Sequence, residues 1–231
     1  MRRIIADAIA KMQPFVTNPH HICAISPPPN AGDMIMRLES LETFIVGTPP
    51  PGFGGRYFIF VRLTTSCGIT GVGEIYAASF APEVVCHMAE DIFQRYLEGQ
   101  APDRIEHFWR QAHGSGFSHR PDPSVQGVVS GLEMACWDIV GKALDRPVHA
   151  LLGGLVNERL RTYTYLYPGP DKDAADFYND ATASAETASL RVAEGFTAVK
   201  FDPAGQYTVY DGRMPDPVSY THLRAHETGI N

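Results

Sequence analysis

Residues 159–203 hold the pattern that most limits the possible folds, a strand, a helix and a second strand in succession. The stretch 159–168 (RLRTYTYLYP) is a strand by its pattern, 173–195 is an Ala-rich helix, and 196–203 (FTAVKFDP) is a second apolar strand. Two strands joined through a helix can pair in parallel, whereas a hairpin needs only a few residues between its strands. This part of the chain is therefore expected to open a parallel βα series.

The residues before this unit predict a different architecture. Three segments rich in alternating, β-branched or aromatic residues are separated by Pro, Gly and Ser, and they predict an antiparallel meander over 36–46, 56–65 and 69–77. Helices are expected next, over 81–99, 103–113, 122–145 and 146–154. A meander with helices, followed by a βα series, indicates an α+β domain that leads into an α/β barrel.

Two of these helices carry more specific expectations. The helix over 122–145, with Ser124 as its N-cap, has a face of apolar residues at helical spacing: Val129, Leu132, Cys136, Ile139 and Ala143. Gly131 and Gly141 lower its helix propensity, which predicts close packing against another backbone. For the helix over 81–99, the residues at i+4 steps are Val84, Met88, Ile92 and Tyr96.

The charge balance argues against one class of function. The formal net charge is −7 and no basic run offsets it, which disfavours a nucleic-acid-binding protein. No apolar run reaches the roughly 20 residues that a membrane helix needs, and the interrupted apolar stretch near the N-terminus does not fit a signal peptide. The four cysteines are scattered, which favours free thiols over disulfides. We expect a cytoplasmic protein with no nucleic-acid or membrane partner.

Both ends of the chain differ from the rest. Residues 1–35 contain Pro-Pro-Pro and no sustained period, so they are expected to be disordered or to precede the true start of the protein. In the tail, His222 and His226 have the spacing of helical zinc ligands. However, residues 217–228 (PVSYTHLRAHET) resemble the in-frame translation of a sequencing adapter. We therefore expect 217–231 to be non-native.

Lys200 and Asp202 stand where the second strand of the βα unit ends. In a closed barrel this end of the strands faces the active site, and alternation places these two side chains on one face with Phe201 on the other. A lysine in a dehydrated barrel mouth can act as a general base. The alternative is a Lys–Asp pair that fixes a loop, and the spacing alone favours this alternative.

Residues 130–154, SGLEMACWDIVGKALDRPVHALLGG, resemble the signature of the mandelate racemase/muconate-lactonizing enzyme family in the enolase superfamily. The shared pattern is a helix rich in small residues with Trp-Asp and Gly-Lys, then Pro, then Leu-Leu-Gly-Gly. The preceding meander and helices resemble the family's capping domain, and 195–203 resembles its second barrel strand. The resemblance covers about residues 36–215. It implies a capping domain over 36–155, followed by the first βα units of a (β/α)₈ barrel over 156–216.

The resemblance also implies a chemistry. In this family a base removes the proton α to a carboxylate, and a divalent cation, usually Mg²⁺, holds the resulting enediolate. A carbon acid is weak and its dianionic intermediate needs strong charge stabilisation, which is why a base and a metal act together. The product then epimerises, cycloisomerises or loses water. The expected partner is a small-molecule carboxylate, and we expect the parent protein to be a homo-oligomer.

By position, Lys200 matches the first lysine of the family's Lys-x-Lys motif, and Asp202 stands where a second lysine is usual. That second lysine is the usual base on this strand, so the departure weighs against racemase chemistry. The segments 163–168 and 195–205 are most similar to the family's acid-sugar dehydratases. We therefore expect an aldonate or aldarate dehydratase with Lys200 and Asp202 as catalytic residues, and a racemase or cycloisomerase is the alternative.

The resemblance places the loops that select the substrate at 48–56 and 76–82. Phe53 is a candidate for excluding water, Arg56 for binding a carboxylate and Tyr76 for binding a sugar hydroxyl. The alternative is that Phe53 only anchors its loop and that Arg56 is solvated.

A complete barrel needs about 250 residues and eight βα units, whereas residues 161–231 supply only two strands. The resemblance implies that the metal ligands are acidic residues at the ends of the third, fourth and fifth strands, which this chain is expected to lack. No residue is therefore assigned to the metal. The chain alone is expected to be inactive, and a non-catalytic α+β module is the alternative description of it.

Overall fold

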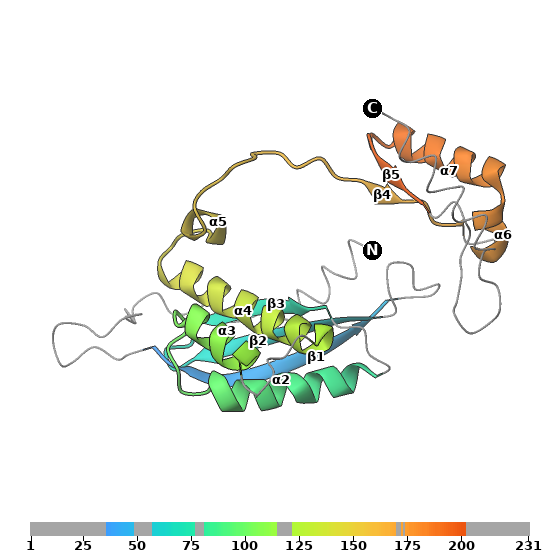
Figure 1. Ribbon diagram of the computed structural model, residues 1–231. Helices are drawn as coiled ribbons and strands as arrows, with labels where there is room; N and C mark the ends of the chain where they lie inside the picture. The colour runs from blue at the N-terminus through green and yellow to red at the C-terminus, as the bar shows by residue number, and fades with distance from the viewer. Residues whose placement is uncertain are drawn as a thin grey trace. The chain divides into compact units, whose positions relative to one another are not determined.

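The computed structural model (Figure 1) describes residues 36–48, 57–76, 81–114, 122–169, 172 and 174–201. The chain divides between Val156 and Asn157 into two compact units. None of the helices in these ranges is long and apolar enough to cross a membrane. The expectations for residues 1–35 and for the tail at 217–231 lie outside the described residues.

The first unit contains a three-stranded antiparallel sheet in the order β1-β2-β3. Its strands are β1 (Leu38–Gly47), β2 (Tyr57–Thr65) and β3 (Thr70–Ile75). Phe60 of β2 lies opposite Phe44 on one side and Glu74 on the other. Alternation along β2 buries Ile59, Val61 and Leu63, as a strand with one covered face requires. The predicted meander is confirmed.

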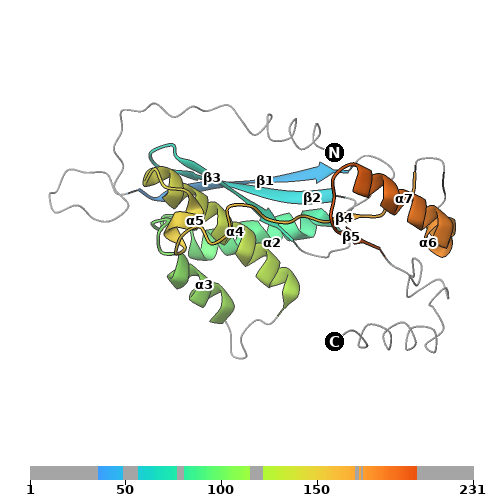
Figure 2. The ribbon, with the colours of Figure 1, turned by 90° about the horizontal axis from the view of Figure 1, so that it is seen from above.

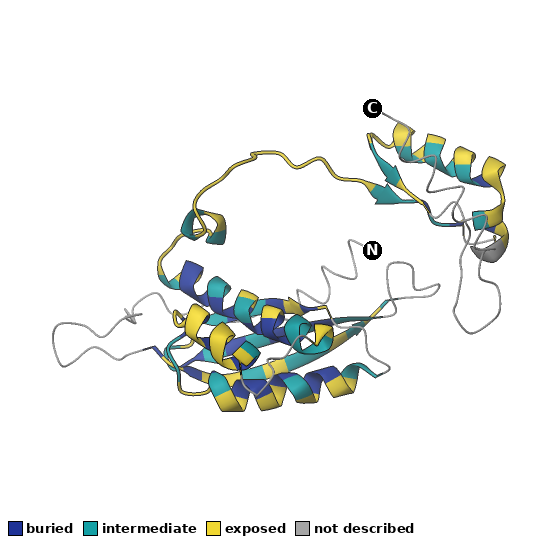
Figure 3. Cartoon of the chain, viewed as in Figure 1, coloured by how far each residue is buried: buried dark blue, intermediate teal, exposed yellow. Residues whose placement is uncertain are grey.

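Four helices follow the sheet: α2 (Pro82–Tyr96), α3 (Ile105–Gly114), α4 (Pro123–Ala143) and α5 (Val148–Leu151). Figure 2 shows that α2, α3 and α4 lie on one side of the sheet. Their inward faces are buried and their outward faces are exposed (Figure 3). On α4 the predicted apolar face is confirmed, since Val129, Leu132, Cys136 and Ile139 are buried and Ala143 packs against the same core.

One local expectation for these helices is wrong. The N-cap of α4 is Asp122 and not Ser124, because Pro123 already occupies the first helical turn and the cap must precede it. One Asp122 carboxylate oxygen accepts from the amides of Ser124 (2.7 Å) and Val125 (3.2 Å). On α2, Ile92 of the row at i+4 steps is buried and Met88 and Tyr96 pack against the same core. The first residue of the row, Val84, is 56% exposed.

Glycines allow α4 and β3 to approach each other closely. A Cβ atom on Gly73 would lie 1.9 Å from the carbonyl oxygen of Gly131, and one on Gly71 would lie 2.0 Å from that of Ala135. A Cβ atom on Gly141 would lie 2.8 Å from the carbonyl oxygen of Arg146. The predicted close packing at Gly131 and Gly141 is therefore confirmed, and only glycine fits at these contacts.

The second unit is the strand–helix–strand segment. Strand β4 (Thr164–Tyr165) pairs in parallel with β5 (Val199–Lys200), with Tyr165 opposite Lys200. The predicted parallel pairing is confirmed, although both strands are shorter than expected. The single helix expected over 173–195 is divided into α6 (Ala174–Asn179) and α7 (Ala181–Ala193). Asp180 causes the division, because its carboxylate accepts from the Thr182 and Ala183 amides and so caps a new helix.

Candidate functional site

The described part of the candidate site lies where β4 and β5 end. Parallel strands end at the same edge of a sheet, so Tyr165 and Lys200 lie side by side at that edge. The Leu166 amide donates to the Lys200 carbonyl oxygen at 2.8 Å, which continues the pairing beyond β4. In open and closed α/β sheets this edge is where ligands bind.

The two faces of the β4–β5 pair differ. Leu166 is buried with Phe177 and Ala183, and Val199 packs against the same small core, so this face is covered by α6 and α7. Side chains alternate along a strand, which directs Lys200 to the opposite face from Val199. The Lys200 side chain is exposed there. In a barrel with its helices outside, this helix-free face is the interior face.

Two tyrosine rings lie beside the Lys200 ammonium group. Its Nζ lies 5.9 Å from the ring centroid of Tyr163 and 5.7 Å from that of Tyr165. Both distances are within the range in which an aromatic face attracts a cation. The Tyr165 ring in turn stacks on Tyr167, with centroids 5.0 Å apart and planes at 26°. Desolvation raises the pKa of Tyr167, and the nearby Tyr163 phenol raises it further.

We refer to Tyr163, Tyr165, Tyr167 and Lys200 as the tyrosine–lysine cluster. Lys200 is predicted from the sequence as a site residue, whereas the three tyrosines are not. Their spacing of two residues was the available signal, because it places all three on one face of a strand. The parallel register then decides which residue of the other strand they meet, and that register is visible only in the structure.

The other predicted site residues lie in the first unit or outside the described residues. Tyr76 follows β3 in the first unit and is 87% exposed, so its hydroxyl is accessible to solvent. Phe53, Arg56 and Asp202 lie outside the described residues.

The Trp-Asp and Gly-Lys positions of the signature have a structural role. The Asp138 carboxylate accepts from the Val72 amide of β3 at 2.9 Å and from Lys142 Nζ at 2.8 Å. Lys142 Nζ also donates to the Thr70 carbonyl oxygen at 2.8 Å. The two side chains thus bind one edge of β3 to α4, beside the glycine contacts.

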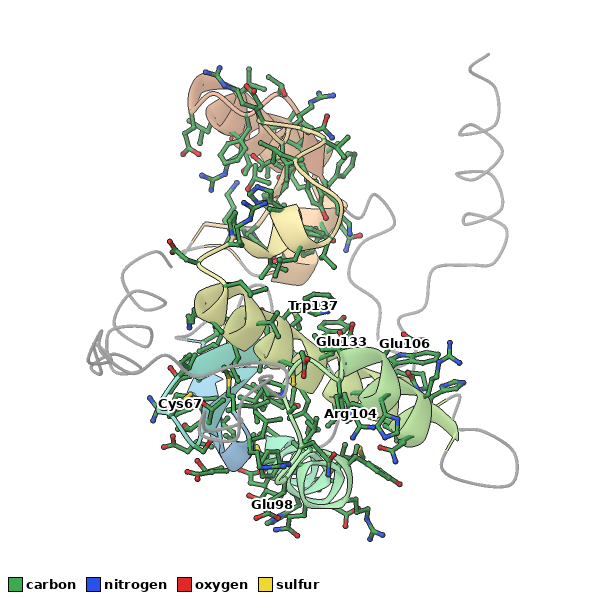
Figure 4. The ribbon with its side chains drawn as sticks, turned by 90° about the vertical axis from the view of Figure 1, so that its left-hand side faces the viewer. Cys67, Glu98, Arg104, Glu106, Glu133 and Trp137 are labelled. Atoms are coloured by element: carbon green, nitrogen blue, oxygen red, sulfur yellow. The ribbon has the colours of Figure 1, made fainter. Side chains whose placement is uncertain are left out.

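The tryptophan of the signature also serves the first unit. Trp137 packs against its core, and Nε1 donates to the Glu133 carboxylate one turn earlier on α4 at 3.3 Å. Figure 4 shows these two side chains next to each other on α4. The signature therefore identifies a way of packing a helix on a sheet, and not a catalytic centre.

The described residues do not form a metal site. No group of three or more His, Cys, Asp or Glu side chains among them could hold a metal ion. We therefore assign no described residue to Mg²⁺. What the tyrosine–lysine cluster can do chemically is present a fixed cation to an anionic group, such as a carboxylate, at the strand ends.

Comparison with known proteins identifies the first unit. The N-terminal domain of mandelate racemase/muconate lactonizing enzyme matches residues 53–153. The D-galactonate dehydratase of Ralstonia pickettii (strain 12J) is 38% identical over 141 residues, which are 60% of this chain and 33% of that protein. The chain thus spans about a third of the length of this curated relative.

Solved structures agree with this similarity. The mandelate racemase/muconate lactonizing enzyme from Jannaschia sp. CCS1 is 54% identical, with a TM-score of 0.72, over 82% of this chain and 49% of that chain. An enolase from Pantoea ananatis with bound D-gluconate and Mg is 25% identical, with a TM-score of 0.58, over 72% of this chain and 36% of that chain. Residues 53–153 thus match the N-terminal domain of the mandelate racemase/muconate lactonizing enzyme family of the enolase superfamily, and the described structure has this capping domain followed by the start of the barrel.

Proposed function

We propose that this chain is part of an acid-sugar dehydratase. The observation that carries the proposal is its similarity to D-galactonate dehydratases, which reaches 38% identity. A second, more distant protein of the superfamily binds D-gluconate. Both ligands are aldonic acids, that is, polyhydroxy chains that end in a carboxylate.

The proposed reaction removes one molecule of water. A base takes the proton from the carbon next to the carboxylate, and the hydroxyl of the following carbon leaves with a proton as water. The enol that remains takes up a proton at that carbon and becomes a 2-keto-3-deoxy acid. The first step is difficult because the carbon-bound proton is weakly acidic, so a positioned base and a cationic environment are both needed.

In this proposal Lys200 contributes positive charge or acts as the base, together with Asp202. Its exposed ammonium group on the helix-free face, at the strand ends, supports this assignment. Phe53, Arg56 and Tyr76 are the proposed substrate contacts. The 87% exposure of Tyr76 is compatible with a hydroxyl that is available to a ligand.

Mg²⁺ is the proposed cofactor of the whole enzyme, because the gluconate-bound relative carries Mg. Since the described residues form no metal site, no step of the reaction is assigned to a metal ligand of this chain. We therefore expect the metal ligands to lie outside the residues that the structure describes.

The test is an assay with D-galactonate and with D-gluconate in the presence of Mg²⁺, which measures formation of the 2-keto-3-deoxy acid. It is run on this chain and on a protein extended by further coding sequence to the relatives' length. Turnover by the extended protein that EDTA abolishes and Mg²⁺ restores is the expected result. No turnover of any aldonic or aldaric acid by the extended protein contradicts the proposal.

Two outcomes distinguish the alternatives. Exchange of the α proton with deuterated water without loss of water favours a racemase of the same family. Activity confined to the extended protein favours the description of the 231-residue chain as a non-catalytic α+β module. This second description is supported by the small share of its relatives that the chain spans.

A further inference from the structure

We infer that Tyr163 and Tyr165 are positioning residues for Lys200, holding its ammonium group at the carboxyl edge of β4 and β5. The inference rests on the proposed function in one respect, since that function gives Lys200 a role at this edge. The geometry itself involves neither substrate nor metal.

The register of the β4–β5 pair determines which side chains lie next to Lys200. Tyr165 lies directly opposite Lys200 in the parallel pair, and Tyr163, which immediately precedes β4, has its ring near the same Nζ. No shift of one residue would preserve this, because it would turn Tyr163 and Tyr165 toward the face that α6 and α7 cover. The pairing therefore fixes which side chains Lys200 meets.

The ammonium group of Lys200 lies close to two aromatic rings. Nζ lies 5.7 Å and 5.9 Å from two different ring centroids, so it is attracted by two aromatic faces rather than one. Tyr165 is itself held by its stacking on Tyr167. Whereas the Tyr165 ring is held by stacking, the Lys200 ammonium group sits at the end of a flexible four-carbon chain. This chain loses conformational freedom when the ammonium group is held in one place.

The consequence is preorganisation. A lysine that is already held at one place has less freedom to lose when an anionic ligand arrives. The rings attract the ammonium group through their faces, so the phenolic hydroxyls are not needed for the effect. A phenylalanine in place of either tyrosine should therefore still hold the ammonium group, whereas a leucine should not.

The experiment follows Lys200 by NMR after reductive methylation with ¹³C-formaldehyde. The chain has only four lysines, Lys11, Lys142, Lys172 and Lys200, so the methyl spectrum is simple. Dimethyl-lysine keeps its positive charge, and Lys200→Arg assigns the signal. Ring currents are expected to shift the Lys200 methyl signal upfield of that of exposed Lys172. Equal shifts for the two lysines in the wild-type chain would overturn the inference.

Variants test the ring contacts separately. The double variant Tyr163→Leu/Tyr165→Leu should move the Lys200 signal to the position of the Lys172 signal, and Tyr163→Phe/Tyr165→Phe should retain the upfield shift. The matched control is Trp109→Leu, which removes an aromatic ring of α3 that is 38% exposed and should leave the Lys200 signal unchanged. If the leucine variant does not fold, the wild-type and phenylalanine spectra still decide. An upfield Lys200 signal that persists in the folded leucine variant contradicts the inference, and a failed dehydratase assay does not affect this readout.

Discussion

Asp138 shows how a single side chain joins two elements. Its carboxylate accepts from the backbone of β3 and from Lys142, and it is one third exposed. Asp138→Ala leaves the Val72 amide without this acceptor and removes the charge partner of Lys142, so we expect a loss of about 1–3 kcal/mol in the free energy of unfolding. Urea denaturation measures it. The control is Glu106→Ala, which breaks a solvated Arg110 pair of the same helical spacing and should cost at most about 0.5 kcal/mol. Equal losses would show that Asp138 does not join α4 to β3.

Cys136 provides a pH-dependent prediction. Desolvation raises the pKa of this buried thiol from 9.0 to about 12, and Glu133 adds a smaller effect. The neutral thiol is favoured in the folded state, so its contribution to stability is complete below the unfolded pKa and is lost as the pH rises toward the folded pKa. Between these values the free energy of unfolding should fall by up to about 1.4 kcal/mol per pH unit from this group. Stability curves of the wild type and Cys136→Ala between pH 8 and pH 11 (about the range in which thiols titrate) should therefore converge. Parallel curves would contradict the assignment.

For single residues, the sequence was sufficient to recognise motifs, but not to identify the residues that each side chain contacts. Lys200 could be chosen because it stands at a strand end, and the tyrosines that hold it could not, since parallel register depends on two segments far apart in the chain. Asp138 and Lys142 could be recognised as parts of a signature. Their role as a connection to β3 depends on a contact across 66 and 72 residues of sequence.

The packing of α4 on β3 depends on a close approach of the two backbones along both elements, and not on one side chain. A methyl group on Gly73 would meet the Gly131 carbonyl at 1.9 Å, so Gly73→Ala must separate the helix from the strand. We expect a loss of about 1–3 kcal/mol in the free energy of unfolding, or more if the backbones cannot move. Gly47→Ala is the control, because no atom lies within 4 Å of its added methyl group. It should be neutral or slightly stabilising. Similar destabilisation by both variants would show that the close approach has no energetic consequence.

The types and the order of the elements could be predicted because hydrophobic periodicity and Gly/Pro punctuation are local. Helix ends were less predictable. Asp180 caps α7 in the middle of an Ala-rich run whose composition favours one continuous helix. On α2 the row at i+4 steps packs against the core at Met88, Ile92 and Tyr96, and only its first residue, Val84, is exposed.

For the whole molecule, the two units differ in how much core supports them. The first unit has 22 buried hydrophobic residues in one cluster, whereas the described part of the second has Leu166, Phe177 and Ala183. The sequence suggested the two parts through the change from meander to βα pattern, but not this difference, because burial depends on how many layers cover each element. Apolar burial is the main favourable term in folding, so the second unit should open far more often than the first.

Hydrogen exchange measures this difference directly. Amides of β2 and α4 are expected to exchange only through global unfolding, while those of β4, β5 and α7 should exchange orders of magnitude faster through local opening. Asp180→Ala, which removes the cap of α7, should accelerate exchange in the second unit only. Asp122→Ala is the corresponding cap variant of α4 and should act on the first unit. Equal protection of both units in the wild type would mean that the second unit is stabilised by contacts other than its own core. In that case a cap substitution in either unit should change exchange in both, because a single cooperative structure opens as one.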